Sequence, residues 1–341
     1  MQLSEKRGSM LHGVLLIALF SCAAFYLSEF EVFRKLSFSP LIIGIILGML
    51  YANSLRNRLP ETWVPGIRFC TKEILRAGIV LYGFRLTFQS VAAVGTAAVL
   101  IDAIVVAGTL LLGVWLGRVL KMEGDLALLT ASGSAICGAA AVLGTEPVVG
   151  AQPHKTAVAV STVVIFGTLS MFLYPVLYRS GVLGLTPAEM GIYTGSTLHE
   201  VAHVVGAGNA MGTEISDTAV IVKMIRVMML APVLLLLSFV AARRGGAAGG
   251  RTKVSVPWFA FGFLAVIGFN SFGLLPDAAV EWIDSFDTFL LTMAMTALGA
   301  ETGFEKFRQA GAKPFLLAGI LYVWLLGGGY LLARYLAPAL A

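Results

Sequence analysis

The chain has 341 residues, of which 58% are hydrophobic and only 13% charged, far below the roughly one-quarter charged residues of an ordinary soluble domain. The formal net charge is +5, and the basic residues are spread over alternate loops, a pattern that reports membrane topology and gives no support to nucleic-acid binding. Three scattered cysteines, Cys22, Cys70 and Cys137, have neither metal-ligand nor disulfide spacing. The sequence therefore predicts an all-α polytopic membrane protein.

Apolar runs of about twenty residues recur with short loops between them, and each is a candidate membrane-spanning helix. Eleven helices are predicted, at residues 11–27, 40–52, 67–86, 91–120, 126–149, 156–178, 187–211, 219–242, 257–275, 282–304 and 314–336. Residues 1–38 are expected to form a cytoplasmic N-terminus and an accessory first helix. Residues 39–183 form a first half with helices 2–6, and residues 184–341 a second half with helices 7–11 and a cytoplasmic linker at 243–256.

The distribution of basic residues in the loops predicts the orientation of the chain. One side carries Lys6, Arg7, Arg56, Arg58, Arg68, Arg118, Lys121, Arg179, Arg243, Arg244, Arg251, Lys253, Lys306, Arg308 and Lys313. The other side carries Arg34, Lys35, Arg85 and Lys155. We therefore expect a multi-pass membrane protein with the N-terminus in the cytoplasm and the C-terminus periplasmic or extracellular.

An internal repeat is visible in the spacing of small and polar residues. Pro40 precedes Asn53-Ser54 at the distance at which Pro257 precedes Asn270-Ser271. Further matches in spacing join Gly83, Phe88, Gly95 and Arg118 to Gly299, Phe304, Gly311 and Arg334. Helices 2–4 thus echo helices 9–11 in opposed orientation, which is typical of the inverted repeats of secondary transporters. The alternative is chance matching among glycine-rich helices.

A weaker echo relates helix 5 to helix 7. Thr130, Ser132 and Gly144 align with Thr194, Ser196 and Gly208. Eleven spans give both helices the same orientation, so either this echo is accidental or one of the two segments is re-entrant.

Helix 5 contains a run of small and hydroxyl-bearing residues in the middle of a span. Ser132, Gly133, Ser134, Cys137 and Gly138 fall in this run, and glycines there favour a break in the helix. A break at membrane depth frees backbone N–H groups that, with the helix dipole, can bind an anion. The alternative is a packing face of small residues.

Helix 7 carries His199-Glu-Val-Ala-His203, with Thr197 just before it. On a continuous helix the two histidines share a face, so they could bind zinc with Glu200 as general base, as in metalloproteases. The same residues are also ionisable groups inside a membrane bundle, where they could relay protons. A third hypothesis is a polar cluster that ties helix 7 to its neighbours.

Charged residues in other spans provide further candidates. Lys223 and Arg226 lie on one face of helix 8 and could neutralise Glu200, attract an anion or extend to the membrane surface. Arg85 and Glu301 occupy nearly matching places in the two repeats, so they are candidates for gating or for a salt bridge between repeats.

Three motifs in this order are similar to one known family. They are Tyr82-Gly-Phe-Arg-Leu-Thr, Ser134-Ala-Ile-Cys-Gly-Ala-Ala-Ala and His199-Glu-Val-Ala-His, and the chain resembles the YeiH-like bacterial membrane proteins, often labelled sulfate exporters. The resemblance implies a relation to the bile-acid symporter and cation–proton antiporter superfamily, whose members have inverted repeats and two broken helices crossing at the bilayer midplane. The family tends to have Gln where this chain has His203, which weakens the zinc hypothesis.

We therefore expect a secondary transporter of the bacterial inner (plasma) membrane that exports a small anion. Sulfate or a sulfonate-derived anion is the leading substrate, and H⁺ is favoured over Na⁺ as coupling ion. The expected partners are the anionic solute and the lipid bilayer, without nucleic acid, metal or cofactor, and a homodimer is left open. The alternatives are an intramembrane zinc metalloprotease using His199, Glu200 and His203, and a scaffold or receptor that transports nothing. The expected substrate-binding residues are Ser132, Gly133, Ser134, Cys137, Gly138, Thr197, Lys223 and Arg226, the ion-coupling residues His199 and Glu200, and the gating or inter-repeat residues Arg85 and Glu301.

Overall fold

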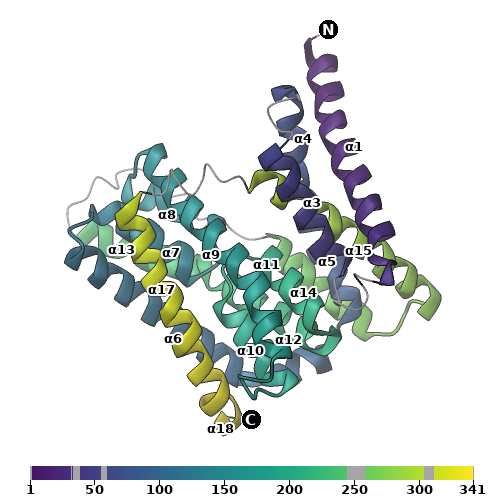
Figure 1. Cartoon of the computed structure of the whole chain (residues 1–341). Coiled ribbons are helices and arrows are strands. Elements are labelled where there is room, and N and C mark those ends of the chain that lie inside the picture. Colours follow the sequence, from purple (N-terminus) through teal and green to yellow (C-terminus); the bar gives the residue numbers. More distant parts are fainter. Residues whose placement is uncertain are drawn as a thin grey trace. The chain divides into compact units, whose positions relative to one another are not determined.

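The computed structural model describes residues 2–31, 33, 39–54, 60–243, 258–302 and 311–340, and these residues form helices joined by turns and short connections. They belong to two compact units, which are coloured along the sequence in Figure 1. Unit 1 comprises residues 1–89 and 258–304, and unit 2 comprises residues 90–257 and 305–341. Each unit is made of two separate stretches of the chain. The predicted halves, residues 39–183 and 184–341, are consecutive stretches that were based on the repeat rather than on packing.

Unit 1 is built on the close packing of α15 against α3 and α5, with α1 lying along α3 and α4. Gly48 and Gly299 make this approach feasible, because a Cβ at either position would overlap a backbone carbonyl of the facing helix. The elements of unit 1 are α1 (Gln2–Ser28), α3 (Pro40–Ser54), η2 (Glu61–Trp63), α4 (Val64–Phe69), η3 (Cys70–Ile74), α5 (Leu75–Tyr82), η4 (Gly83–Arg85), α14 (Trp258–Ser271) and α15 (Asp277–Glu301).

Two asparagines in unit 1 make reciprocal contacts that follow the predicted repeat. The side-chain nitrogen of Asn53, near the end of α3, donates to the carbonyl of Thr302 at 3.4 Å. That of Asn270, near the end of α14, donates to the carbonyl of Leu86 at 3.0 Å. In the register of the repeat Leu86 and Thr302 are equivalent positions, so each copy uses its asparagine to hold the same place in the other copy.

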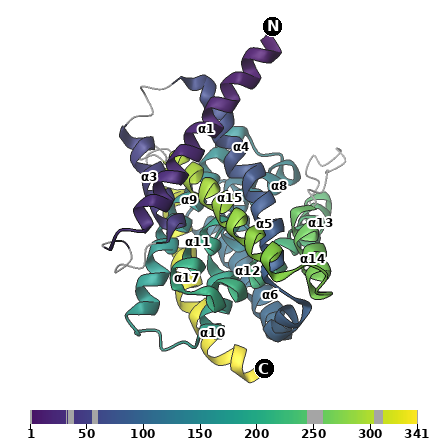
Figure 2. The same ribbon diagram turned by 90° about the vertical axis from the view of Figure 1, so that its right-hand side faces the viewer.

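Unit 2 contains the helices that carry most of the predicted site. Its elements are α6 (Phe88–Val119), which begins at the boundary with unit 1, then α7 (Gly124–Ala135), α8 (Ala139–Val149), α9 (Pro153–Arg179), α10 (Pro187–Thr197), α11 (Val201–Met211), α12 (Thr213–Met228), α13 (Leu230–Arg243), α17 (Ala312–Leu331), η5 (Leu332–Leu336) and α18 (Ala337–Leu340). Figure 2 shows the same helices from the side.

The repeat also extends to two glycines with the same backbone conformation. Gly95 interrupts α6 with φ +73°, and Gly311 caps the start of α17 with φ +73°. Residues with a side chain are strained in this left-handed region, so glycine is the residue that allows the bend at both places. The matched spacing seen in the sequence therefore corresponds to a matched backbone feature.

The segment predicted as helix 5 is a hairpin of two half-helices, α7 and α8. Lys155, at the start of α9, has its Nζ 2.5 Å from Glu123 Oε2 and 2.6 Å from Asp125 Oδ2, which lie at the start of α7. Because α8 and a connection of a few residues separate Lys155 from the break, α8 must return along α7 to the end of unit 2 where α7 began. The prediction of a single span at 126–149 is therefore wrong.

The segment predicted as helix 7 is a second hairpin, made of α10 and α11, that enters from the opposite end of unit 2. Arg179, the last residue of α9, donates from its Nη2 to the carbonyl of Ala210 at the end of α11, at 2.6 Å. The chain turns directly from α9 into α10, whose first turn is fixed by a capping box between Thr186 and Glu189. Both ends of this hairpin thus lie at the far end of α9.

Two hairpins entering from opposite ends remove the conflict between the weaker echo and the topology. Each segment is a helical hairpin, and the two hairpins have the opposed orientation that an inverted repeat requires. In the predicted topology, two hairpins that do not cross the membrane move only the loops carrying Lys155 and Arg179 to the other side. The orientation of the other loops and of the termini stays a prediction.

The number of membrane crossings stays a prediction. Among the described residues, the helices long and apolar enough to span a membrane are Met10–Ser28, Val94–Val119, His154–Arg179, Thr213–Val240 and Ala312–Leu340. Outside the described residues lie the predicted linker from residue 244 onward and the basic residues Arg34, Lys35, Arg56, Arg58, Arg244, Arg251, Lys253, Lys306 and Arg308.

Cysteine labelling in whole cells or oriented vesicles tests the hairpins. With the three native cysteines replaced by alanine, single cysteines at the exposed positions Glu123 and Gln152 are expected to react with an impermeant maleimide from one side of the membrane. Cysteines at Ser180 and Glu214 are expected to react from the other side. If positions 123 and 152 are labelled from opposite sides, α7 and α8 form one continuous span.

Candidate functional site

The candidate site lies where the tips of the two hairpins meet inside unit 2. The first tip, residues 136–138, leaves helical geometry at Ile136 (φ −115°, ψ −86°) and at Gly138, whose φ is +70°. The second tip, residues 198–200, is extended at Leu198 and at Glu200. Each tip therefore exposes the carbonyl end of one half-helix and the N–H end of the next.

Lys223 of α12 joins the carbonyl groups of both tips. Its Nζ donates to the carbonyls of Ile136 at 2.9 Å, Leu198 at 2.7 Å and His199 at 2.9 Å. The side chain is fully buried, and an ammonium has three hydrogens to donate. All three are therefore used on backbone oxygens, and none remains for a solute in this conformation.

Arg226 lies about one helical turn further along α12 and donates hydrogen bonds to backbone carbonyls at the ends of α7 and α10. Its Nε donates to the carbonyl of Ala135 at 2.8 Å, and its Nη2 to that of Ser134 at 2.9 Å. Its Nη1 donates to the carbonyls of Ser196 at 2.5 Å and Leu198 at 3.3 Å. Since these oxygens have no partner within their own half-helices, the guanidinium supplies hydrogen bonds and offsets the negative ends of two helix dipoles.

Glu200 provides the negative counterpart at the amino end of α8. Its Oε1 accepts a hydrogen bond from the backbone N–H of Ala139 at 3.0 Å, which is the favourable place for a carboxylate at a helix N-terminus. Gly138 makes this contact feasible, because a Cβ there would overlap Cγ of Glu200. The carboxylate of one hairpin thus caps a half-helix of the other.

Asp102 of α6 completes the charge balance of the site. It is fully buried and interacts attractively with Arg226 and Lys223. Neither of its carboxylate oxygens has a hydrogen-bond partner among the described residues. Two cations on α12 are therefore matched by two carboxylates, Asp102 and Glu200.

The two histidines are buried beside the second tip. In the described part of the chain, no ring nitrogen of His199 or His203 has a hydrogen-bond partner. Nδ1 of His203 lies 3.8 Å from Oε2 of Glu200, and the ring of His199 lies 6.5 Å from that of Tyr322, centroid to centroid. His199 precedes α11 and only His203 lies on it, so the one-face geometry on which the zinc hypothesis rests is not formed.

The remaining candidates in unit 2 lie on or near the same tips. The hydroxyl of Ser132 donates to the carbonyl of Leu128 in its own helix at 2.7 Å, and that of Thr197 lies 2.8 Å from the hydroxyl of Tyr174. Gly133, Ser134 and Cys137 are buried at the end of α7 and in the first tip. The backbone of this segment, rather than its hydroxyl groups, makes the contacts to Lys223 and Arg226.

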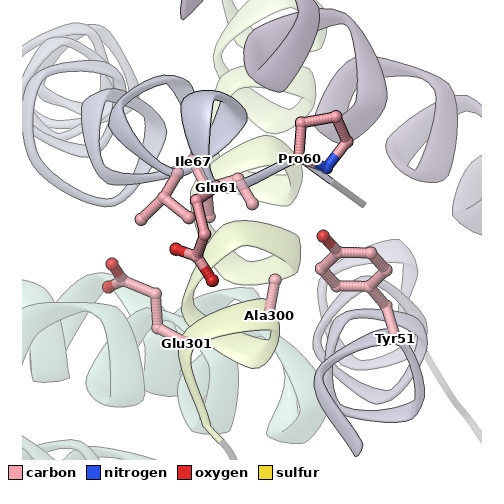
Figure 3. A pocket seen from close by; sticks show the side chains of 7 residues that line it. Tyr51, Pro60, Glu61, Ile67, Ala300 and Glu301 are labelled. Carbon is pink, nitrogen blue, oxygen red and sulfur yellow. The ribbon is translucent and has the colours of Figure 1, made fainter. Parts of the chain in front are cut away.

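Arg85 and Glu301 belong to unit 1 and have separate partners there. Nη2 of Arg85 is 3.0 Å from Asp287 Oδ2 on α15, whereas Oε1 of Glu301 is 3.7 Å from Nε of Arg68. Figure 3 shows Glu301 with Glu61 at a small pocket of unit 1, which is also lined by Tyr51. The contact of Arg85 joins the first copy of the repeat to the second, through Asp287.

Asp102 and Asp287 are residues to which sequence reasoning gave no role. Both are fully buried acids, and each interacts with basic residues that the sequence did single out. For Asp102 the available signal was a lone acidic residue inside an apolar span, which indicates a functional or pairing role. Asp287 follows Glu281 and Asp284 closely and does not stand out in the sequence. The sequence does not indicate which cation each one meets, because the partners are distant in the chain.

The fold and the site define an all-α membrane protein with two helical hairpins whose tips meet. The family model described as Conserved hypothetical protein 698 matches residues 12–318. A UPF0324 membrane protein of Bacteroides thetaiotaomicron is 67% identical over 335 residues, which cover 97% of this chain and 100% of that protein. The chain belongs to this family, the YeiH-like membrane proteins.

More distant relatives match over nearly the same length. UPF0324 membrane proteins of Pseudomonas putida and Bordetella pertussis are 47% and 48% identical, and the matches cover 94% of this chain and 91% and 93% of those proteins. No solved structure matches the chain significantly.

Replacing Lys223 by methionine tests whether this cation holds the tips together. Methionine replaces the lysine stem with an unbranched apolar chain one atom shorter and leaves three buried carbonyls without their donor. We expect the free energy of unfolding in detergent to fall by about 3 kcal/mol or more, seen as a lower apparent melting temperature.

Two controls make this result specific. Arg76→Met removes an exposed cation paired with Glu73 and is expected to change stability by less than about 0.5 kcal/mol. Adding Asp102→Asn to Lys223→Met is expected to cost about 1 kcal/mol less than the sum of the two single changes, because it restores charge balance. Full additivity, or a harmless Lys223→Met, would contradict the assignment.

Proposed function

We propose that this protein is a secondary transporter of a small anion, with the solute bound at the two hairpin tips. The proposal is supported by non-helical backbone and buried charges meeting inside a membrane protein, an arrangement that is costly unless it serves a solute or an ion. Paired re-entrant elements related by an inverted repeat are the form that substrate sites take in many transporters.

The preference for an anion rests on one observation: Lys223 and Arg226 occupy the carbonyl ends of α7 and α10. The negative ends of those half-helices are thereby compensated, while the amino ends of α8 and α11 stay available as positive ends. Glu200 already places a carboxylate at one of them. The tips are thus suited to an anion with acceptor oxygens, and sulfate or a sulfonate-derived anion remains the leading substrate.

The same contacts favour H⁺ over Na⁺ as the coupling ion. Sodium sites in transporters use the unwound carbonyls and carboxyl ends of broken helices. At both tips these oxygens accept hydrogen bonds from Lys223 and Arg226. Protons can instead be carried by His199 and Glu200 in the second tip, the residues expected to couple ions.

The proposed location is a bacterial inner membrane, with the N-terminus cytoplasmic and the C-terminus outside. The relatives matched above are membrane proteins of bacteria, and the loop charges outside the two hairpins still favour this orientation. Export is the proposed direction.

Reconstitution into liposomes tests the function. With the purified protein, labelled sulfate is expected to exchange across the membrane faster than in protein-free liposomes, and to accelerate under a pH gradient. Sulfite, taurine and small carboxylates serve as competitors. Ser134→Leu, which fills the buried end of α7, is expected to abolish exchange, whereas Ser134→Ala retains it.

The melting temperature of each variant, measured alongside, shows whether it is folded. Exchange at the protein-free rate with every solute would contradict the transporter proposal. Stoichiometric zinc that His203→Ala removes, together with cleavage of a membrane substrate, would instead support the protease alternative.

A further inference from the structure

We propose that the Glu200 carboxylate is a tethered occupant of the anion site, which the transported anion replaces at the amino end of α8 when Glu200 takes up a proton. This inference rests on the proposed function and assigns to one residue both the closure of the empty site and the coupling to protons.

The contact between the two tips has the form of a built carboxylate site. The Ala139 N–H points to Oε1 of Glu200 at 3.0 Å, and it belongs to the first turn of the eleven-residue half-helix α8. Gly138 leaves the volume of a side chain free where the Glu200 stem lies. A carboxylate and a small oxyanion offer the same acceptor oxygens and negative charge, so either one satisfies this amino end.

His203 supplies the second, independent observation. Its imidazole is fully buried, and both ring nitrogens are without partners within the described residues. Nδ1 lies 3.8 Å from Oε2 of Glu200, which is beyond hydrogen-bond distance. An unpartnered donor group beside the carboxylate leaves the site short of one acceptor, which an oxyanion with oxygens on several sides can provide.

The charges around Glu200 determine what its protonation does. The groups facing it are Lys223 from α12, Cys137 from the first tip and His203 from its own half-helix. Together with Arg226 and Asp102, the ionised Glu200 balances the charge of the site. When Glu200 is protonated, one positive charge is left uncompensated together with the amino ends of α8 and α11, each equivalent to about half a positive charge. Because a buried uncompensated charge is costly, an anion with up to two negative charges is drawn into the vacated place.

Exposure of the side chains agrees with an exchangeable occupant. The Glu200 side chain is 16% exposed, whereas that of His203 is 0% exposed, and Lys223 and Arg226 are also 0% exposed. Glu200 is thus a partly exposed charged group at the tips, while the two cations are fully buried and bound to the backbone.

The test is the pH dependence of sulfate binding by the purified full-length protein, measured as sulfate-dependent thermal stabilisation. Sulfate is a suitable probe because its own charge is constant between mildly acidic and neutral pH. For the wild type we expect sulfate affinity to rise by up to about tenfold per pH unit as pH falls from about 7.5 to about 5.5, since one proton is taken up with each anion.

Glu200→Gln keeps the shape of the side chain and removes the charge. We expect this variant to bind sulfate at neutral pH at least as tightly as the wild type binds it at low pH, with no remaining pH dependence. Glu214→Gln, which neutralises an exposed carboxylate in the first turn of α12, is the matched control and is expected to keep the wild-type profile. His203→Ala in the Glu200→Gln background is expected to weaken sulfate binding about tenfold.

The outcomes separate this inference from the proposed function. If the wild type and Glu200→Gln bind sulfate with the same affinity and pH profile, Glu200 does not occupy the anion site, although the transporter proposal stands. Weaker binding in a folded Glu200→Gln protein would overturn the inference in the same way, since it would make Glu200 a ligand. If neither protein binds sulfate at any pH, both the inference and the proposed substrate class fail.

Discussion

The structure of unit 2 depends on the hydrogen bonds that Lys223 and Arg226 make to the carbonyl ends of two half-helices. A helix that stops inside a membrane leaves carbonyl oxygens that water cannot reach, and each unsatisfied group costs several kcal/mol. The two buried cations satisfy those of α7 and α10 from one face of α12. They also bring the hairpins together, because each cation bonds to residues at or beside both tips.

Fixing the carbonyl ends determines the chemistry of what remains. Among the described residues at the tips, the amino ends of α8 and α11, Glu200 and the buried histidines are polar groups that the two cations do not bind directly, and Glu200 already caps the amino end of α8. The positive charges of Lys223 and Arg226 are balanced when Asp102 and an ionised Glu200 are in place. A solute or proton that changes this balance therefore acts on the contact between the two hairpins, which is the property that ion-coupled transport requires.

Much of this arrangement could be predicted from the sequence, and the rest could not for identifiable reasons. The apolar runs located the helices, and the glycine run around Gly138 indicated the first break, whereas a break in the segment around His199 was implied only by the family resemblance. Periodicity cannot tell a half-helix that returns from one that continues, so both hairpins were predicted as spans. The partners of Lys223, Arg226 and Asp102 come from distant segments of the chain. In a sequence, a basic residue that binds backbone carbonyls also looks the same as one that binds an anion. The hydrogen bond between Ala139 and Glu200 could not be predicted either, because these two residues are also distant in the sequence.

Anomalous diffraction from crystals grown with selenate, an isosteric analogue of sulfate, tests the central claim most directly. For Glu200→Gln we expect a selenium peak within hydrogen-bond distance of the Ala139 N–H and beside His203, with Lys223 and Arg226 still on the hairpin carbonyls. In the wild type near neutral pH we expect the Glu200 carboxylate in that place. A selenate bound elsewhere while the side chain at 200 stays on Ala139, or one bound directly by Lys223 and Arg226, would contradict the account.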